Sequence, residues 1–187
     1  DSGFTQIHRV PIAGGAPSRL FEVKEGNYGS PVMAGTALVG TYVASTQPAE
    51  IVRIDPAAGG HALLTDSNRA TLDALDLPKP EHFWFTAKNG KRIHSVVYFP
   101  PGLDRSKKYP LIVNPHGGPN SMDSDTFSTR WNAHLLTAPG YVLVQTNYTG
   151  STGFGETFAN DIERDVLRGP AQEVLEGAAE AARRYPF

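Results

Sequence analysis

The chain has 187 residues, of which 40% are hydrophobic and 19% charged, a balance that allows a buried core and excludes wholesale disorder. Seventeen Lys and Arg against nineteen Asp and Glu give a formal net charge of −2. No basic field exists to hold a phosphate backbone, so nucleic acid is not expected as a partner. The absence of cysteine excludes a disulfide scaffold, a thiol nucleophile and a cysteine-ligated zinc site. The apolar runs are too short to cross a membrane.

Short β-type runs fill the first part of the chain. They alternate apolar and polar residues or are rich in β-branched residues, and turn residues separate them. The runs are residues 21–23, 37–43, 51–54 and 61–65. They predict antiparallel strands, with a turn over 55–60. A sheet this small is marginal alone, so we expect neighbouring structure to cover its faces.

The texture changes at the stiff connection Leu77-Pro78-Lys79-Pro80. We place a domain boundary there, which predicts one domain over residues 1–77 and another over 78–187. Beyond the boundary, strands and helices alternate, as they do in α/β domains.

Four strands are predicted in the second domain. Residues 81–86 and 92–99 flank an Asn-Gly pair, which is a strong signal for a β-hairpin. Residues 111–113 and 141–144 are continuous apolar runs, which are typical of strands buried on both faces of a parallel sheet. A helix between these two runs would make a right-handed crossover.

Two helices are predicted. The first covers 128–137, where Trp131, Leu135 and Leu136 have helical spacing, and Pro139-Gly140 ends it. The second begins near Gly169-Pro170. Its apolar face is predicted to carry Val174, Leu175, Ala178, Ala179 and Ala182.

Only Tyr185-Pro186-Phe187 follow the last predicted helix, although an open α/β sheet needs several parallel strands. We therefore expect this polypeptide to be part of a larger protein, with an incomplete β domain in front and an incomplete α/β domain behind. Unpaired strand edges and an uncovered helix face would make it poorly stable in isolation.

The sharpest motif is His116-Gly117-Gly118-Pro119, which follows the apolar run 111–113. Consecutive glycines at the carboxyl end of a strand let the backbone turn with its N–H groups facing a crevice, where they could bind negative charge on a substrate oxygen. The alternative is an ordinary tight turn, in which His116 only hydrogen-bonds to the loop.

A second glycine-rich loop, residues 147–155, follows the other apolar run. Loops at this edge of a parallel sheet are where α/β proteins bind ligands. A phosphate cradle is disfavoured, because the Gly-Lys-Ser/Thr ending of a P-loop is missing and Gly153-Phe154-Gly155 has no third glycine three residues later. A structural loop that supports the wall of an active site fits better.

Together the two loops resemble the start of the catalytic domain of the prolyl oligopeptidase family of serine peptidases, particularly its acylaminoacyl-peptidase and bacterial dipeptidyl-peptidase branch. Residues 80–99 and 109–113 are similar to the lead-in strands of that family, and 41–66 to its final propeller blade. The family commonly has arginine where Thr149 stands and tyrosine where Phe154 stands. The resemblance implies an α/β fold, the N-terminal part of an α/β-hydrolase domain preceded by the last blade or blades of a β-propeller.

The resemblance also implies roles. Gly117 and Gly118 would form the backbone of an oxyanion hole, and His116 would support that loop without being the general base. The nucleophile of such enzymes sits in a Gly-x-Ser-x-Gly elbow, and no serine here has glycine both two before and two after it. Ser151 comes nearest but has Thr149 two residues before it. The triad is thus expected beyond Phe187, and this chain alone is expected to be inactive.

The implied partners are a peptide substrate and the complementary C-terminal part of the same protein, with no membrane partner, cofactor or metal. Tyr148 could line the active-site wall or pack in the core. Asp161, Glu163 and Asp165 could be imagined as metal ligands, but such a run is usually a solvated face. The scattered histidines lack the spacing of a zinc site.

Two rival functions stay open. An esterase or lipase of the same fold also places a His-Gly-Gly turn at its oxyanion hole, although a third glycine often stands where Pro119 does. A non-catalytic interaction module could use the β region to bind a partner. Exopeptidase or endopeptidase action, cleavage specificity, homo-oligomer formation and compartment are left open.

Overall fold

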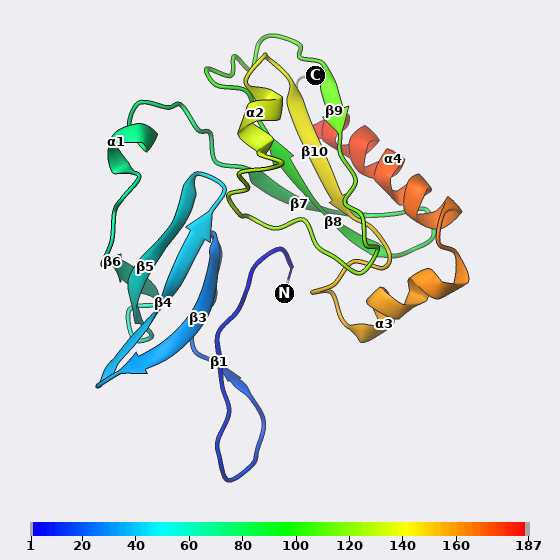
Figure 1. Cartoon of the computed structure of the whole chain (residues 1–187). Helices are drawn as coiled ribbons and strands as arrows, with labels where there is room; N and C mark the ends of the chain where they lie inside the picture. Colours follow the sequence, from blue (N-terminus) through cyan, green and yellow to red (C-terminus); the bar gives the residue numbers. More distant parts are fainter. Residues whose placement is uncertain (1, 186–187) are drawn as a thin grey trace. The chain divides into compact units, whose positions relative to one another are not determined.

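The computed structural model describes residues 2–185 and divides into two compact units (Figure 1). The first, here called the sheet unit, comprises Phe4–Leu75 and Asp125–Ser128. The second, the α/β unit, comprises Asp76–Ser124 and the chain from Thr129 onward, together with the residues before Phe4. The units are described separately.

The sheet unit contains a four-stranded antiparallel sheet. Its strands lie in chain order: β3 (Asn27–Ala34), β4 (Ala37–Ala44), β5 (Gln47–Asp55) and β6 (Gly60–Leu63). A two-stranded ribbon, β1 (His8–Arg9) and β2 (Ser18–Arg19), and a one-turn helix, α1 (Arg69–Leu72), complete the unit. The strands predicted near 37–43, 51–54 and 61–65 are present, and the turn at 55–60 joins β5 to β6.

Strand β3 was not predicted, because Gly29-Ser30-Pro31 interrupts its apolar pattern. The structure accommodates these residues in a β-bulge between Gly29 and Val32, with Ser30 at a φ of 46°. β3 is an edge strand, where a proline costs no ladder hydrogen bond on the outer side. A bulge at an edge therefore explains why turn-type residues lie within a strand.

The strand predicted at 21–23 is wrong. Val23 lies in the core of the sheet unit but has no strand partner. The side chain of Gln6 replaces that partner, since its amide accepts from Val23 N at 3.0 Å and donates to Val23 O at 3.1 Å. An amide side chain can thus satisfy a buried backbone that the sequence pattern assigns to a ladder.

Asp125 holds residues 125–128 in the sheet unit, although the sequence places them in the second predicted domain. The Asp125 carboxylate accepts from Gly26 N at 2.7 Å and from Ser45 N at 2.8 Å, and its backbone carbonyl accepts from Asn27 Nδ2 at 2.5 Å. Asp125 is only 3% exposed. A buried carboxylate is stable when backbone N–H groups bond to it, and here those groups belong to the sheet unit.

The α/β unit is built on a mixed four-stranded sheet in the order β7-β8-β10-β9. The strands are β7 (Glu81–Thr86), β8 (Arg92–Tyr98), β9 (Leu111–Val113) and β10 (Val142–Asn147). β9 and β10 are parallel, whereas the β7–β8 and β8–β10 pairs are antiparallel. The predicted hairpin is confirmed: Gly90 has a φ of 85°, which the tight turn between β7 and β8 requires.

Apolar side chains cover both faces of this sheet. Val142 and Val144 pack with Val97 and with Ala181 of helix α4 (Arg168–Arg184), whereas Leu143 packs with Tyr98 and with Leu136 of helix α2 (Ala133–Thr137). Figure 1 shows the two helices on opposite faces of the sheet. Residues 142–144 are all 0% exposed. The apolar run at 142–144 therefore did indicate a strand buried on both faces, whereas β9, at the edge of the sheet, is only half-buried.

The first predicted helix is shorter than expected. Helix α2 spans only Ala133–Thr137, because the side chain of Asn132 caps it by accepting from His134 N at 2.9 Å and Leu135 N at 3.3 Å. Trp131 and Leu135, predicted to mark its apolar face, are 68% and 71% exposed. Leu136 packs on the sheet instead.

Three helical segments follow β10: α3 (Glu156–Asn160), the 3₁₀ helix η1 (Asp161–Arg164) and α4 (Arg168–Arg184). The Asp165 carboxylate receives the first backbone N–H groups of α4, from Leu167, Arg168 and Gly169, at 2.7 to 3.2 Å. No helix within residues 2–185 is long and apolar enough to cross a membrane.

The buried face of α4 differs from the predicted one. It consists of Pro170, Glu173, Gly177 and Ala181, and Leu175 is 63% exposed. Gly177 lies against β10, where a Cβ would come within 2.5 Å of Thr146 Oγ1. Thr146 Oγ1 in turn lies 3.0 Å from Ser95 Oγ on β8. Small side chains let the helix approach the sheet, so the face is set by close contact as well as by hydrophobicity.

The substitution Gly177→Ala is expected to destabilise the protein by up to about 2 kcal/mol, which is the cost of overpacking less the gain in helix propensity. In an exposed helix interior, alanine is favoured over glycine by about 1 kcal/mol, but overpacking a close contact costs about 1 to 3 kcal/mol and also disturbs the buried Ser95–Thr146 hydrogen bond. Equilibrium unfolding in guanidinium chloride measures the change.

Ala182→Gly is the matched control, because Ala182 lies exposed on the same helix. This reverse exchange should lose about 1 kcal/mol through helix propensity alone. Alanine would then be favoured at 182 and disfavoured at 177. A Gly177→Ala protein as stable as the unchanged one would contradict the close contact.

Candidate functional site

Two loops begin at neighbouring strand ends in the α/β unit. Because β9 and β10 are parallel, their carboxyl ends meet at one edge of the sheet. Residues 114–124, here called the His-Gly-Gly loop, follow β9, and residues 148–155, the glycine-rich loop, follow β10. The pairing extends one step into the first loop, where Asn114 N donates to Val144 O at 3.0 Å.

His116 joins the two loops. Its ring stacks on that of Tyr148, with centroids 4.5 Å apart and planes 14° apart, and the Tyr148 hydroxyl donates to His116 O at 2.6 Å. His116 Nδ1 lies 3.1 Å from Gly117 O and its Nε2 lies 2.8 Å from Ser151 Oγ. A carbonyl oxygen only accepts, so Nδ1 carries the proton and the Ser151 hydroxyl donates to Nε2. Burial lowers the pKa of His116, which favours this neutral form.

Further hydrogen bonds fasten the remainder of the His-Gly-Gly loop. Asn120 Nδ2 donates to Gly150 O at 2.9 Å, and Thr152 N donates to Ser121 O at 2.8 Å. The loop is thus held to the glycine-rich loop by backbone and side-chain contacts at several points.

Gly117 and Gly118 lie exposed at the tip of this arrangement. Gly118 has a φ of 135°, and a Cβ there would come within 3.1 Å of Asn120 N, so this position requires glycine. Within residues 2–185, neither of the two glycine N–H groups donates to a protein acceptor. Both are therefore available to an acceptor from outside the chain.

Tyr148 is only 8% exposed, and its hydroxyl and ring are both engaged with His116. Desolvation, with the Asp123 carboxylate adding to it, raises the pKa of its phenol. Its contacts are those of a side chain that holds a loop. Lining of a substrate site by Tyr148 stays a prediction.

Ser151 and His116 form a hydroxyl–imidazole pair that superficially resembles a nucleophile with its base. Ser151, however, is 0% exposed, so a substrate carbonyl cannot reach its Oγ. The other nitrogen of His116 faces the carbonyl of Gly117, where an activated serine would need an orienting carboxylate. The pair fastens two loops and does not supply a nucleophile.

A buried carboxylate anchors the start of the glycine-rich loop. Glu173 on α4 is 1% exposed and accepts from Thr149 N at 2.6 Å, Thr149 Oγ1 at 2.7 Å and Asn89 Nδ2 at 2.7 Å. Lys91 Nζ lies 3.2 Å from Thr149 Oγ1 and 2.9 Å from Asp161 Oδ2. Sequence reasoning missed Glu173. Its one signal is that it stands four residues before Gly177 and eight before Ala181, on their face of the helix.

A second buried polar group lies between β8 and the His-Gly-Gly loop. His94 is 1% exposed, and desolvation, with His82 adding to it, lowers its pKa to about 3. Desolvation raises the pKa of Asp123 to about 7, and within residues 2–185 its Oδ2 has no hydrogen-bond partner. Asn147 lies between the two and bonds to both residues. The sequence held no sign that these residues meet.

The acidic run has structural partners in this fold. Asp161 pairs with Lys91, and Asp165 caps α4. Over the described residues, no three His, Cys, Asp or Glu side chains gather as metal ligands would.

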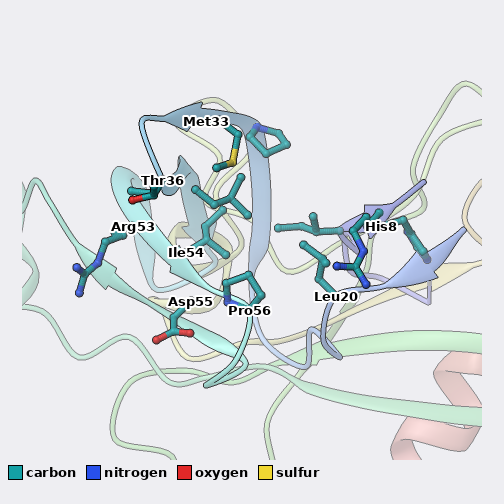
Figure 2. A pocket seen from close by; sticks show the side chains of 13 residues that line it. His8, Leu20, Met33, Thr36, Arg53, Ile54, Asp55 and Pro56 are labelled. Carbon is teal, nitrogen blue, oxygen red and sulfur yellow. The ribbon is translucent and has the colours of Figure 1, made fainter. Parts of the chain in front are cut away.

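The sheet unit has a hollow of about 740 Å³ between its ribbon and its sheet. Figure 2 shows His8 and Leu20 on one side of it and Met33 and Ile54 on the other. Its lining is largely apolar, with charged side chains such as Arg53, which is exposed. No motif from the sequence lies there, so the two loops of the α/β unit are the candidate site.

The comparisons with known proteins match the C-terminal third of the chain, which includes the glycine-rich loop, to a peptidase family. Residues 127–187 match the sequence profile of the prolyl oligopeptidase family. The chain is 31% identical over 165 residues to dipeptidyl-peptidase 4 of Giardia intestinalis. This alignment covers 85% of this chain and 21% of that relative.

Solved acylaminoacyl peptidases have a similar structure. The Pyrococcus horikoshii enzyme matches with a TM-score of 0.82 at 27% identity. A complex of an acylaminoacyl peptidase with Z-Gly-Gly-Phe-chloromethyl ketone matches with a TM-score of 0.84 at 25% identity. Each match covers 100% of this chain and 28% of the solved chain. The chain therefore spans 21% to 28% of the length of these similar proteins.

Asp123→Asn is expected to change how stability depends on pH. The pKa of Asp123 rises from 3.8 to about 7 on folding, so the folded protein keeps a proton that the unfolded chain releases between these values. The protonated Asp123 carboxyl stabilises the folded state fully at a pH below the pKa of the unfolded chain. This stabilisation is lost as the pH rises through the pKa of the folded protein. The variant should gain stability relative to the unchanged protein by up to about 1.4 kcal/mol per pH unit over this interval. Chemical unfolding across it measures the difference.

Asp165→Asn serves as the control, because its effect on stability should depend on pH in the opposite direction. Backbone N–H groups of Gly169, Leu167 and Arg168 lower the pKa of Asp165, so its stabilisation is present at neutral pH and lost on acidification. The cost of this substitution should therefore shrink at low pH. Parallel curves for the Asp123→Asn and unchanged proteins would contradict the burial of the Asp123 carboxyl.

Proposed function

Because the chain is a member of the prolyl oligopeptidase family of serine peptidases, we propose that it is part of an enzyme that hydrolyses short peptides through an acyl-enzyme. One observation carries the proposal. Gly117 and Gly118 are exposed, and their N–H groups are unused within the described chain, in a loop that His116 and Tyr148 hold at the carboxyl edge of a parallel strand pair.

Gly117 and Gly118 are proposed to provide the oxyanion hole. When a serine attacks an acyl carbon, the carbonyl oxygen becomes an oxyanion, and backbone N–H groups already aimed at it stabilise this charge without reorganising. One such donor contributes about 2.7 to 4 kcal/mol to the transition state. The glycine at 118 allows the required φ, and nothing lies within 4 Å of a Cβ at 117, which leaves room for a substrate.

His116 is proposed as structural support for that hole. Both of its ring nitrogens are already engaged, Nδ1 with Gly117 O and Nε2 with Ser151 Oγ. A general base must have a free nitrogen within reach of the nucleophile. His116 instead fixes the carbonyl of the peptide group that contains the Gly118 N–H, and so orients that donor.

The serine, aspartate and histidine of the triad are proposed to come from a complementary C-terminal part of the same protein. No serine of this chain sits in a Gly-x-Ser-x-Gly elbow. Large apolar side chains also stay exposed on the α/β unit, where further structure could cover them: Trp131, Leu135, Val166, Leu167 and Leu175. The chain alone would therefore be inactive.

The two units fit the two domains of such an enzyme. The α/β unit would be the N-terminal part of the hydrolase domain, and the antiparallel sheet of the sheet unit would be a terminal propeller blade. In such an enzyme, a propeller domain would restrict access to short peptides and exclude folded proteins. Dipeptidyl-peptidase and acylaminoacyl-peptidase action are both compatible with this chain.

The chain in isolation is expected to resist labelling by a fluorophosphonate probe, whereas the complete enzyme should be labelled on a serine outside these residues. The complete enzyme should also cleave aminoacyl p-nitroanilides. Labelling of a serine within this chain would refute the assignment of the triad. Turnover of p-nitrophenyl esters without any amide turnover would favour an esterase.

Gly118→Ala in the complete enzyme is expected to lower kcat by about 10²-fold or more, with a smaller change in KM, because it displaces a donor to the transition state. Gly140→Ala is the matched control. Gly140 also has a positive φ, 101°, but lies in the turn after α2 with nothing within 4 Å of a Cβ. Equal losses of kcat in both variants would attribute the effect to backbone strain and contradict the oxyanion role.

A further inference from the structure

We propose that Asn147, oriented by His94, is a positioning residue that fixes the far end of the His-Gly-Gly loop. The inference rests on the proposed function, since positioning matters here because Gly117 and Gly118 lie in that loop. Asn147 is the last residue of β10 and is 0% exposed. Its side chain exchanges two hydrogen bonds with the backbone of Asp123: Asp123 N donates to Asn147 Oδ1 at 2.8 Å, and Asn147 Nδ2 donates to Asp123 O at 2.9 Å.

Only one orientation of the Asn147 amide satisfies these contacts. Reversing it would set the NH₂ group against the Asp123 N–H and the amide oxygen against the Asp123 carbonyl. The second Nδ2 hydrogen points to His94 Nδ1, 2.9 Å away. His94 therefore acts as an acceptor at Nδ1. This acceptor favours the amide orientation in which Asn147 bonds to the backbone of Asp123.

The register of the sheet brings these side chains together. Asn147 and His94 are directly opposite on the antiparallel strands β10 and β8. Cross-strand neighbours on one face lie close enough for their side chains to bond. The contact therefore follows from the strand pairing and does not depend on a flexible loop.

The proton positions of the histidines follow from the same chain of contacts. Because His94 Nδ1 accepts, a neutral His94 carries its proton on Nε2, which lies 3.0 Å from His82 Nδ1. His82 then accepts at Nδ1. The rings of Trp84 and Phe154 pack at 5.1 and 5.6 Å from that of His94 and exclude water. The hydrogen bonds run in one direction, from His94 to His82 and from Asn147 to His94.

Two successive residues of the chain thus hold the two ends of the loop. Tyr148 holds His116 at the near end, and Asn147 holds Asp123 at the far end. Gly117 and Gly118 lie between these supports. Catalytic donors must be held within about 0.5 Å of their productive position. Asn147 adds a buried support at the far end of the loop to the contacts that Asn120 and Ser121 make with the glycine-rich loop.

The test compares Asn147→Asp with Asn132→Asp in the complete enzyme. A carboxylate at 147 still accepts from Asp123 N but cannot donate to Asp123 O or to His94. The change at 132 adds the same charge in the same unit, and aspartate caps helix α2 as well as asparagine does. We expect Asn147→Asp to lower kcat at least tenfold per fluorophosphonate-titrated site with little change in KM, and Asn132→Asp to change neither.

A second pair of variants tests the role of His94. His94→Gln keeps an acceptor for Asn147, whereas His94→Leu removes it at similar volume. The glutamine enzyme should keep kcat within a few fold of the unchanged one, and the leucine enzyme should lose at least tenfold. Equal kcat in His94→Gln and His94→Leu would overturn the positioning role, even if the substitutions lower stability. Equal kcat in Asn147→Asp and Asn132→Asp would overturn it as well.

The direction of the hydrogen bonds has a readout that is independent of activity. In ¹⁵N-histidine NMR, the signal that is missing from His94→Gln is that of His94, and it should show a neutral ring protonated at Nε2. In Asn147→Asp, the His94 signal should shift to that of a ring protonated at Nδ1 or of an imidazolium. A ring protonated at Nδ1 in the unchanged protein would refute the arrangement. If the complete enzyme is not labelled by fluorophosphonate, the proposed function fails, and this NMR result still decides the orientation of Asn147.

Discussion

The parallel pairing of β9 with β10 is the constraint on which the rest of the candidate site depends. It brings the carboxyl ends of two strands, more than thirty residues apart in sequence, to one edge of the sheet. Each strand delivers a loop there, and the loops can then satisfy each other's backbone. Residues 142–144 are completely buried, so both loops begin next to a strand in the core of the α/β unit.

Buried polar side chains carry this constraint from the sheet into the loops. Glu173 binds the start of the glycine-rich loop, and Asn147 binds the end of the His-Gly-Gly loop. In each case the partner is a loop backbone group that would otherwise be unsatisfied. A loop held by such bonds has few alternative conformations, because breaking one leaves a polar group buried without a partner.

The sequence predicted what depends on local pattern and on motif. The apolar runs located β9 and β10, the Asn-Gly pair located the β7–β8 hairpin, and the His-Gly-Gly motif located the loop with exposed glycines. Prediction from the sequence failed where a residue distant in the sequence determines the local structure. Strand β3 needed a bulge at a sheet edge, and the face of α4 was set by a glutamate whose partners lie on a hairpin and a loop. The spacing of hydrophobic residues indicates neither the edge position of β3 nor the hydrogen-bond partners of Glu173.

The proposed function would divide two requirements of acyl transfer between two parts of the protein. An oxyanion hole needs donors fixed before the reaction, since their value lies in not having to reorganise. A nucleophile and its base need only meet these donors in the right geometry. Here the contacts that hold the loop carrying Gly117 and Gly118 include those of His116, Tyr148, Asn120 and Asn147. The proposed hole would therefore be formed by the first part of the hydrolase domain, and the triad would be positioned against it when the remaining strands add to the sheet.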